Sequence, residues 1–424
     1  MKILQIEGTG CNLEGIAKSD GKIYFVPYAL CGESVEVISS KQSSKFETVS
    51  KFQLLQKSHQ RTEPKCKYYG CCGGCQIQHT NYKNELLLKQ NLVKNNLKKF
   101  KIETDVKETV YCENQYNYRN KVTFFVSDGK LCLKDVNNQN IQIDRCEIID
   151  ENINKILPII DEYLLSIKIL NIFIKSVIIR YINNKYLILF VISKKLNFDF
   201  LIKILTKNKI NFGLFYSINN KNNSNIPSSD YSLVQGIEDI EITENNIKYK
   251  INPYSFLQVN NSVKSKLYES VLNNISPNEV VADCYSGSGL LSAQICQKAN
   301  WVYAIEIDKL ASGICSQLAK VNKLKNLISI NGDCSVEVPN LCKKEEISTI
   351  VLDPPRKGCE RVVLESIINQ NSVKKLIYIS CNSATLGRDL QIILENSDFK
   401  IQSITPFDMF PKTANIETLV VLSK

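Results

Sequence analysis

The 424-residue chain has no long apolar run, and its first residues are not predominantly apolar. A membrane-spanning helix needs about 18 or more consecutive apolar residues. The most apolar stretch, residues 169–192, is interrupted by Lys175, Arg180 and the Asn-Asn-Lys sequence at 183–185. Residues 1–7 lack the apolar core of a signal peptide. We therefore expect a cytoplasmic protein that makes no contact with a membrane.

Histidine is also scarce. The two histidines, His59 and His79, both lie in the first fifth of the chain. A histidine general base in the C-terminal third is therefore not expected, and proton transfer there must depend on other side chains.

The net charge of +10 favours a polyanionic partner such as nucleic acid. An AT-rich genome also enriches a protein in Lys, Asn and Ile, so the net charge alone does not show that the protein binds nucleic acid. Residues 116–124 interleave aromatic and cationic side chains, a pattern suited to stacking on bases and contacting phosphates. A β-strand with a charged start has the same appearance.

Sixteen cysteines are present, and in a cytoplasmic protein they are expected to be reduced thiols or metal ligands. Cys66, Cys72 and Cys75 are spaced C-x5-C-x2-C, with two glycines in the second gap. We expect Cys146 to supply a fourth ligand. The spacing suits both an iron–sulfur cluster and a structural zinc. Because Cys71 and Cys72 are adjacent, either of them could be the ligand at this position.

Turn signals and strand-like runs divide the chain into three expected domains. Residues 1–57 have the short strands and glycine turns of a small β-barrel. Residues 58–250 mix strands and helices: a packing helix over 81–100 with a solvated basic side, a hairpin of strands 177–182 and 186–192, and an exposed loop over 217–229. Residues 251–424 alternate strands with helices, which predicts a parallel, doubly wound α/β sheet.

Several strands of this last domain are followed by polar residues suited to a nucleoside. Only two glycines, Gly287 and Gly289, follow the first strand, so a pyrophosphate-binding fingerprint is disfavoured. Glu306 ends the next strand and suits ribose hydroxyls, and Asp333 ends the third and suits an adenine amino group. A nucleoside without phosphates, S-adenosylmethionine, fits this set.

Cys381 follows the apolar strand 376–379, where open α/β sheets place their ligand crevices. This position suits a nucleophile, although an inert half-buried thiol would look the same. The turn Asp353-Pro-Pro-Arg356 follows another strand, and its prolines stiffen the loop that holds Asp353.

Three segments together resemble RNA 5-methyluridine methyltransferases. They are Asp353-Pro-Pro-Arg-Lys-Gly358, Ser380-Cys-Asn-Ser-Ala-Thr-Leu-Gly-Arg-Asp389 and Ile416-Glu-Thr418; the stretch Phe256-Leu-Gln-Val-Asn260 resembles the family's glutamine motif. The N-terminal stretch resembles a TRAM domain, an RNA-binding barrel. With the cysteine set, it matches the branch that modifies 23S ribosomal RNA. Asn415 departs from the family, where a histidine is frequent, and so does Leu290, where a polar residue is common.

The resemblance implies a Rossmann-like methyltransferase domain, S-adenosylmethionine as cofactor and a [4Fe–4S] cluster held by Cys66, Cys72, Cys75 and Cys146. It implies Cys381 as the nucleophile that adds to carbon 6 of uracil and Glu417 as the base that removes the carbon 5 proton. Asp353 would position the uracil or the thiol. The expected cofactor contacts are Gln258, Tyr285, Glu306 and Asp333, with Asp353 beside them.

These resemblances predict a monomeric methyltransferase that acts on carbon 5 of a uridine in 23S rRNA. The alternatives are a tRNA target and a non-catalytic RNA-binding or ribosome-assembly protein built on the same sheet. The presence of Cys381, Asp353 and Glu417 together argues against the last.

Overall fold

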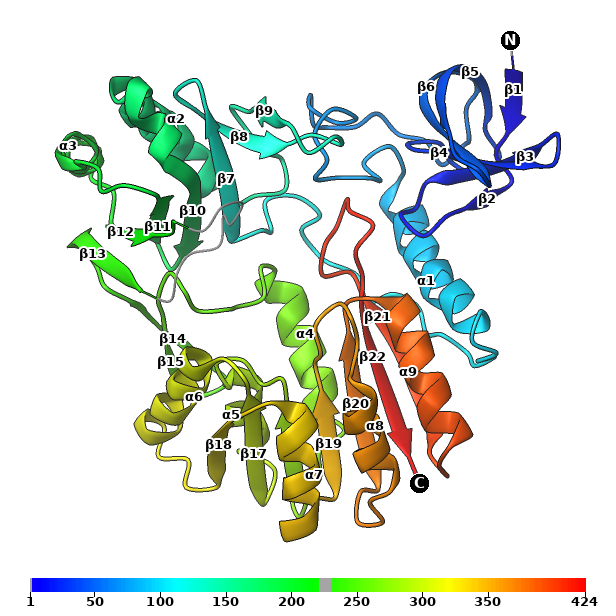
Figure 1. Ribbon diagram of the computed structural model, residues 1–424, viewed down its shortest axis with the longest axis vertical. Coiled ribbons are helices and arrows are strands. Elements are labelled where there is room, and N and C mark those ends of the chain that lie inside the picture. The colour runs from blue at the N-terminus through cyan, green and yellow to red at the C-terminus, as the bar shows by residue number, and fades with distance from the viewer. Residues whose placement is uncertain (1, 221–229) are drawn as a thin grey trace.

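The structure is a computed structural model that describes residues 2–220 and 230–424. Its strands form a small N-terminal sheet, a central seven-stranded sheet, a two-stranded hairpin and a C-terminal seven-stranded sheet. In Figure 1 the N-terminal and central sheets lie side by side above the C-terminal one. Within the described residues, no helix is both long and apolar enough to cross a bilayer.

The N-terminal sheet curls on itself. Its order is β1-β5-β6-β4-β3-β2, so the two outermost strands follow each other directly in the chain. The backbone N–H of Glu7 between them donates to Ile16 in β3, which joins the two ends. The strands are β1 (Lys2–Gln5), β2 (Gly8–Thr9), β3 (Gly15–Ser19), β4 (Lys22–Val26), β5 (Ser34–Gln42) and β6 (Phe46–Gln56).

The central sheet has the order β13-β12-β11-β10-β7-β8-β9. One face packs against helices α2 and α3. The other face, through residues such as Ile178 and Leu189, joins the core of the C-terminal sheet. The elements are β7 (Lys121–Ser127), β8 (Lys130–Lys134), β9 (Asn140–Gln142), α2 (Glu151–Ser166), a 3-10 helix (Lys168–Phe173), β10 (Ile174–Ile182), β11 (Lys185–Ile192), α3 (Asp199–Lys207), β12 (Phe212–Ile218) and β13 (Tyr231–Gly236).

The hairpin expected around Asn183 and Asn184 is present as β10 and β11, paired antiparallel. Both asparagines have positive φ, 49° and 60°, as a tight two-residue hairpin turn requires. The loop expected over 217–229 differs: Ser217 and Ile218 end β12, and residues 221–229 lie outside the described part of the chain.

The hairpin β14 (Ile240–Glu244) and β15 (Ile247–Ile251) packs in the core of the C-terminal sheet. The boundary expected at residue 250 falls within β15.

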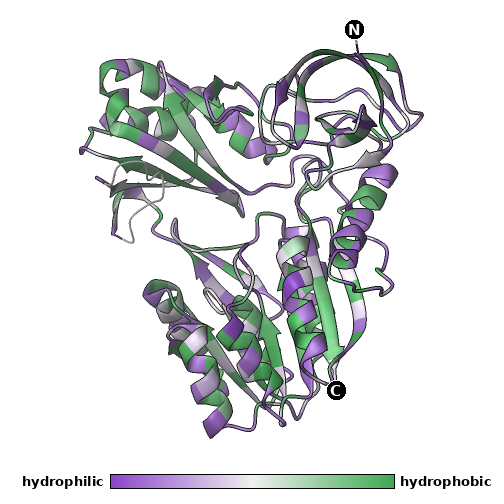
Figure 2. Cartoon of the chain, turned by 45° about the vertical axis from the view of Figure 1, so that its right-hand side comes forward, coloured by the Kyte–Doolittle hydropathy of each residue, from purple (hydrophilic) through white to green (hydrophobic). Residues whose placement is uncertain are grey.

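The C-terminal sheet has the order β18-β17-β16-β19-β20-β22-β21. Its first five strands are parallel, as predicted, but β22 runs antiparallel to both of its neighbours, β20 and β21, which corrects the expectation of a wholly parallel sheet. Its strands are largely hydrophobic, whereas the helices around them are mixed (Figure 2). The strands are β16 (Val280–Cys284), β17 (Trp301–Glu306), β18 (Leu327–Asn331), β19 (Thr349–Leu352), β20 (Lys375–Ser380), β21 (Lys400–Phe407) and β22 (Glu417–Ser423).

Helices cover both faces of this sheet, so it is doubly wound. Residues of α4, α5 and α6 share one core, and residues of α1, α7, α8 and α9 share the other. The helices are α4 (Asn261–Leu272), α5 (Leu290–Ile295), α6 (Lys309–Val321), α7 (Cys334–Lys344), α8 (Arg361–Ile368) and α9 (Ser383–Glu395).

Helix α1 (Tyr82–Lys98) lies against α9 (Figure 1) and buries charged residues. Lys89 is fully buried and binds Glu85 on its own helix and Asp408 after β21. Glu85 also accepts from the Lys412 ammonium at 2.9 Å. The expectation of a plain packing helix is thus incomplete. The buried face of α1 carries an ionic network that binds Asp408 and Lys412, in the segment between β21 and β22.

Lys89→Met should destabilise the fold, because it leaves Glu85 and Asp408 buried without their shared cation. Removing one partner of a buried ion pair costs about 3–5 kcal/mol. Urea unfolding followed by circular dichroism should show a loss of that order. Lys98→Met, in the last turn of the same helix and exposed, should change stability by less than about 0.5 kcal/mol. Equal losses in the two variants would contradict the assigned role of the network.

Candidate active site

A cavity of about 1150 Å3 opens at the carboxyl edge of the C-terminal sheet, with the central sheet as part of its wall. All seven residues that the sequence predicts for catalysis and cofactor contact in this domain line it. They are Gln258, Tyr285, Glu306, Asp333, Asp353, Cys381 and Glu417.

The topology explains why Glu417 joins the others. Parallel strands β16 to β20 deliver their last residues to one edge, where Cys381 follows β20. Strand β22 runs antiparallel to β20 with Ser380 opposite Thr418. Its first residue, Glu417, therefore arrives at the same edge, one position along from that pair and beside Cys381. The reversal that the sequence analysis missed is what brings the predicted base to the predicted nucleophile.

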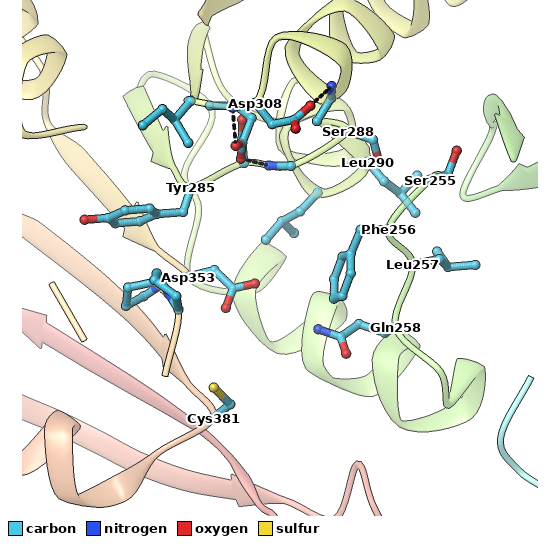
Figure 3. A pocket seen from close by; sticks show the side chains of 18 of the residues that line it. Ser255, Phe256, Leu257, Gln258, Tyr285, Ser288, Leu290, Asp308, Asp353 and Cys381 are labelled. Carbon is cyan, nitrogen blue, oxygen red and sulfur yellow. Dashed lines mark hydrogen bonds between the residues drawn. The ribbon is translucent and has the colours of Figure 1, made fainter. Parts of the chain in front are cut away.

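The glycine turn after β16 is fixed by backbone geometry. Gly289 has φ of 78°, and a Cβ there would lie 2.2 Å from the Cys315 sulfur, so only glycine fits. Gly287 has φ of 56° with open space where a side chain would be. Its N–H donates to Glu306 Oε2 at 2.8 Å, and the N–H of Asp308 donates to Oε1 at 2.8 Å. The second strand's carboxylate thus holds the turn in place (Figure 3).

Asp333 caps helix α7. Its side chain accepts a hydrogen bond from the Ser335 N–H at 2.8 Å. This bond lowers the pKa of Asp333 below its usual value, so the carboxylate stays charged at the cavity wall.

Cys381 sits half-buried between the end of β20 and the start of α9. In Figure 3 its sulfur lies on the same side of the cavity as Asp353, with Gln258 and Phe256 opposite. Burial, together with the carboxyl groups of Glu417 and Asp353, raises the pKa of Cys381 to about 11. In the free protein the thiol is therefore neutral near pH 7.

The carboxyl groups around the thiol resist ionisation. Burial, with Asp283 nearby, raises the pKa of Asp353 to about 7. Burial also raises the pKa of Glu417 well above its usual value, and Asp353 adds to the shift. Carboxyls whose pKa values are raised in this way suit proton transfer at physiological pH.

The turn after β19 is tied to the elements beside it. The carbonyl oxygen of Arg356 accepts from the side chains of Asn382 at 3.1 Å and Thr385 at 3.2 Å. The Arg356 guanidinium donates to Asn415 Oδ1 at 3.1 Å. Asn415, which departs from the histidine frequent in the resembling family, thus braces the segment before Glu417.

Two cavity residues escaped the sequence analysis. Asp283 is buried within β16 and bound by the hydroxyl of Ser292, and burial raises its pKa to about 7. An acid inside an apolar strand was the available signal. Phe256 is 68% exposed although apolar, and its ring projects into the cavity (Figure 3). The sequence does not predict that this ring is exposed; the only indication is that Phe256 lies two residues before Gln258, an expected cofactor contact.

The four predicted cysteine ligands meet at a second, smaller cavity. Cys66, Cys72, Cys75 and Cys146 all line a space of about 210 Å3. Cys71 is exposed and does not line it, so Cys72 is the better placed of the adjacent pair. Side chains from β7 separate the two cavities, and Thr123 lines both.

In the described part of the chain, these thiols do not form a ready-made site for a metal ion. Across residues 2–220 and 230–424, no group of three or more His, Cys, Asp or Glu side chains is arranged to hold a metal ion. Zinc–sulfur bonds of about 2.3 Å would place four ligand sulfurs roughly 3.8 Å apart, with no space among them. Burial, with the neighbouring thiols, raises the pKa of Cys75 to about 12, so thiolates here need a compensating cation.

Comparison with known proteins identifies the family. The family model described as tRNA (Uracil-5-)-methyltransferase matches residues 81–424. The chain belongs to this RNA uracil-5-methyltransferase family. Similar curated proteins include an uncharacterized RNA methyltransferase of Clostridium tetani, 32% identical over 99% of this chain and 95% of that protein. Another, from Caldanaerobacter subterraneus, is 30% identical over 99% and 97%.

A solved structure shares the whole fold. The tRNA (uracil-54, C5)-methyltransferase of Pyrococcus abyssi, in complex with S-adenosyl-L-homocysteine, superposes with a TM-score of 0.81. It is 21% identical and the match covers 99% of both chains. The arrangement of N-terminal, central and C-terminal sheets therefore recurs in a second member of the methyltransferase fold.

Proposed function

We propose that this chain transfers a methyl group from S-adenosylmethionine to carbon 5 of a uridine in RNA, through a covalent bond between Cys381 and carbon 6. The observation that supports it most directly is the meeting of Cys381, Asp353 and Glu417 at one cavity, beside a glycine turn braced by Glu306.

The residues of the turn fit the proposed cofactor. The open space beside Gly287 allows a ligand to approach the backbone closely. Glu306 and Asp333 present carboxylates at successive strand ends for ribose hydroxyls and an adenine amino group. Gln258 and Tyr285 also line the cavity and complete the set of expected cofactor contacts. When bound, the cofactor supplies an electrophilic methyl group.

Cys381 supplies the activation that carbon 5 needs. After the thiol loses its proton, the sulfur forms a bond to carbon 6, and the electron pair of the carbon 5–carbon 6 double bond shifts toward carbon 5 and the adjacent carbonyl oxygen. Carbon 5 would then attack the methyl carbon that a bound cofactor supplies, with S-adenosylhomocysteine as the second product. Asp353, whose pKa lies at about 7, stands where it can hold the uracil or accept the thiol proton.

Glu417 completes the reaction. It accepts the proton from carbon 5, the electron pair of that bond restores the double bond to carbon 6, and the sulfur leaves as thiolate. Burial favours this role, because Glu417 with a raised pKa is a stronger base than an exposed carboxylate. The target base must be presented outside a stacked helix to enter the cavity.

Cys381→Ala should abolish methylation of uridine RNA while leaving S-adenosylhomocysteine binding unchanged. Glu417→Gln should form the covalent adduct but fail to release it, because the carbon 5 proton remains. Denaturing gel electrophoresis should show a retarded RNA band with Glu417→Gln and none with Cys381→Ala.

The matched controls are Cys31→Ala and Glu395→Gln, both at exposed positions, and both should retain normal turnover. Normal turnover by Cys381→Ala, or an unretarded band with Glu417→Gln, would contradict the assigned roles.

We propose 23S ribosomal RNA as the target, with the N-terminal sheet acting as an RNA-binding TRAM domain. The support is the resemblance of that sheet's sequence and of the cysteine set to the 23S-modifying branch. A tRNA target is the second candidate, because the Pyrococcus abyssi tRNA enzyme shares this fold along both chains.

Transcripts of 23S rRNA and of tRNA should separate these targets. Incubation with the protein and S-adenosylmethionine, followed by nucleoside mass spectrometry, should reveal 5-methyluridine in the ribosomal transcript at a rate at least about tenfold above that in tRNA. Modification of tRNA alone would replace the proposed target with the second candidate.

We further propose that Cys66, Cys72, Cys75 and Cys146 hold a [4Fe–4S] cluster. A cavity of about 210 Å3 between thiols suits a multi-atom cluster better than one ion. When bound, the cluster would cross-link the cysteine segment to β9 and α2. The backbone at Cys146 is already fixed by Asn154 of α2, through bonds of 2.9 and 3.0 Å.

Anaerobically purified protein should contain about four iron and four sulfide per chain. Cys72→Ser should lose most of this iron, because its thiol lines the cavity, whereas Cys71→Ser should keep it. Stoichiometric zinc without iron would contradict the iron–sulfur cluster and favour a structural zinc. Equal iron content in the two variants would contradict the assignment of Cys72, rather than Cys71, as the ligand.

A further inference from the structure

Lys121 lines the active-site cavity, and Arg180 is buried beside it; neither cation forms an ion pair with an acidic residue in the described part of the chain. Lys121 of β7 and Arg180 of β10 are directly opposite each other in the central sheet. The Lys121 ammonium has no hydrogen bond or ion pair with any residue in the described part of the chain. Arg180 is 1% exposed, and among the described residues its guanidinium forms one hydrogen bond, from Nη2 to the Ser255 carbonyl oxygen at 2.7 Å.

The guanidinium of Arg180 is incompletely satisfied. Its Nε and Nη1 atoms are buried and have no hydrogen-bond partner. A buried donor without a partner costs about 1–3 kcal/mol, and more when charged. Like charges directly opposite in a sheet also repel. The unsatisfied donors and the repulsion between Lys121 and Arg180 both destabilise the folded protein, and a bound anion would reduce both effects.

Sheet geometry directs both side chains toward the cavity. Opposite residues point to the same face of a sheet, as do residues two apart along one strand. Lys121 and Thr123 of β7, and Ile178 of β10, all line the active-site cavity, and Thr123 lies opposite Ile178. Arg180 is opposite Lys121 and two residues from Ile178, so it belongs to the same face.

This face is held close to the predicted glutamine motif. The N–H of Asn120 donates to the Val259 carbonyl oxygen at 3.0 Å, and the Arg180 bond fixes Ser255 in the same segment. Residues 253–259 line the cavity between the two cations and the glycine turn. An anion at Lys121 would therefore lie on the central-sheet side of the segment, away from the carboxylates of Glu306 and Asp333.

We propose that Lys121 and Arg180 bind a backbone phosphate of the RNA, at or next to the uridine that enters the cavity. This inference rests on the proposed function for the identity of the anion. Every RNA nucleotide brings a phosphate with its base, and an unpaired, partly desolvated cation pair attracts it strongly. The site would hold the nucleotide by its backbone while Cys381 and Glu417 act on the base.

Lys121→Met tests the site, because it removes the charge and keeps the length of the side chain. Binding of a short, fluorescently labelled uridine-containing RNA should weaken about tenfold at low salt. The slope of log affinity against log salt should fall by about 0.7, the value for one lost single-strand phosphate contact. The same variant should unfold at a higher temperature than the wild type, since the like-charge repulsion is gone. A merely structural lysine would not produce both changes.

The controls separate this site from other causes. Lys121→Arg should restore the salt slope, and Lys130→Met, at an exposed position on the neighbouring strand β8, should leave it unchanged. An unchanged slope in Lys121→Met would overturn the proposal.

Weakened S-adenosylhomocysteine binding with normal RNA binding would also overturn it, because the anion bound at Lys121 would then be the carboxylate of the cofactor. Wild-type protein that binds RNA with the predicted slope but forms no 5-methyluridine would refute the proposed function and leave the phosphate site standing.

Discussion

The buried ionic network around Lys89 holds together parts that lie far apart in the chain. Through Asp408 and Lys412 it fixes the segment between β21 and β22 against helix α1. The cysteine segment binds the same place, because the N–H groups of Gln76 and Ile77 both donate to the Lys412 carbonyl oxygen. Glu417 begins the strand that follows. The position of the proposed base therefore depends on charges buried between α1 and the C-terminal sheet.

Desolvation gives the cavity its chemistry. Three carboxyl groups, Asp283, Asp353 and Glu417, meet with a thiol at an edge where burial penalises every negative charge. Their raised pKa values make them stronger bases than exposed carboxylates and suit them to proton exchange near neutral pH. On the opposite wall, burial with Arg180 and Arg119 lowers the pKa of Lys121 to about 7. An entering anion would restore full charge to this lysine, so the two walls complement an RNA nucleotide with a reactive base and an anionic backbone.

Much of the site was predictable, because residues at strand ends in an α/β sheet converge on one edge whatever lies between them. That rule placed Glu306, Asp333, Asp353 and Cys381 correctly in one cavity. Strand direction was not predictable from apolar runs, so the reversal of β22 was missed. The buried charges of α1 were missed because their partners lie more than 300 residues away. Pairing of Lys121 with Arg180 likewise depends on sheet register, which short strands do not encode.

The proposed reaction requires a proton to leave carbon 5 of uridine after Cys381 has added to carbon 6. RNA labelled with tritium at carbon 5 of uridine measures that step directly. With S-adenosylmethionine present, the wild-type protein should release tritium to water in proportion to methyl groups transferred. Cys381→Ala should release none. Methyl transfer to RNA without tritium release would contradict the mechanism, since the methyl group would then reside elsewhere on the nucleotide.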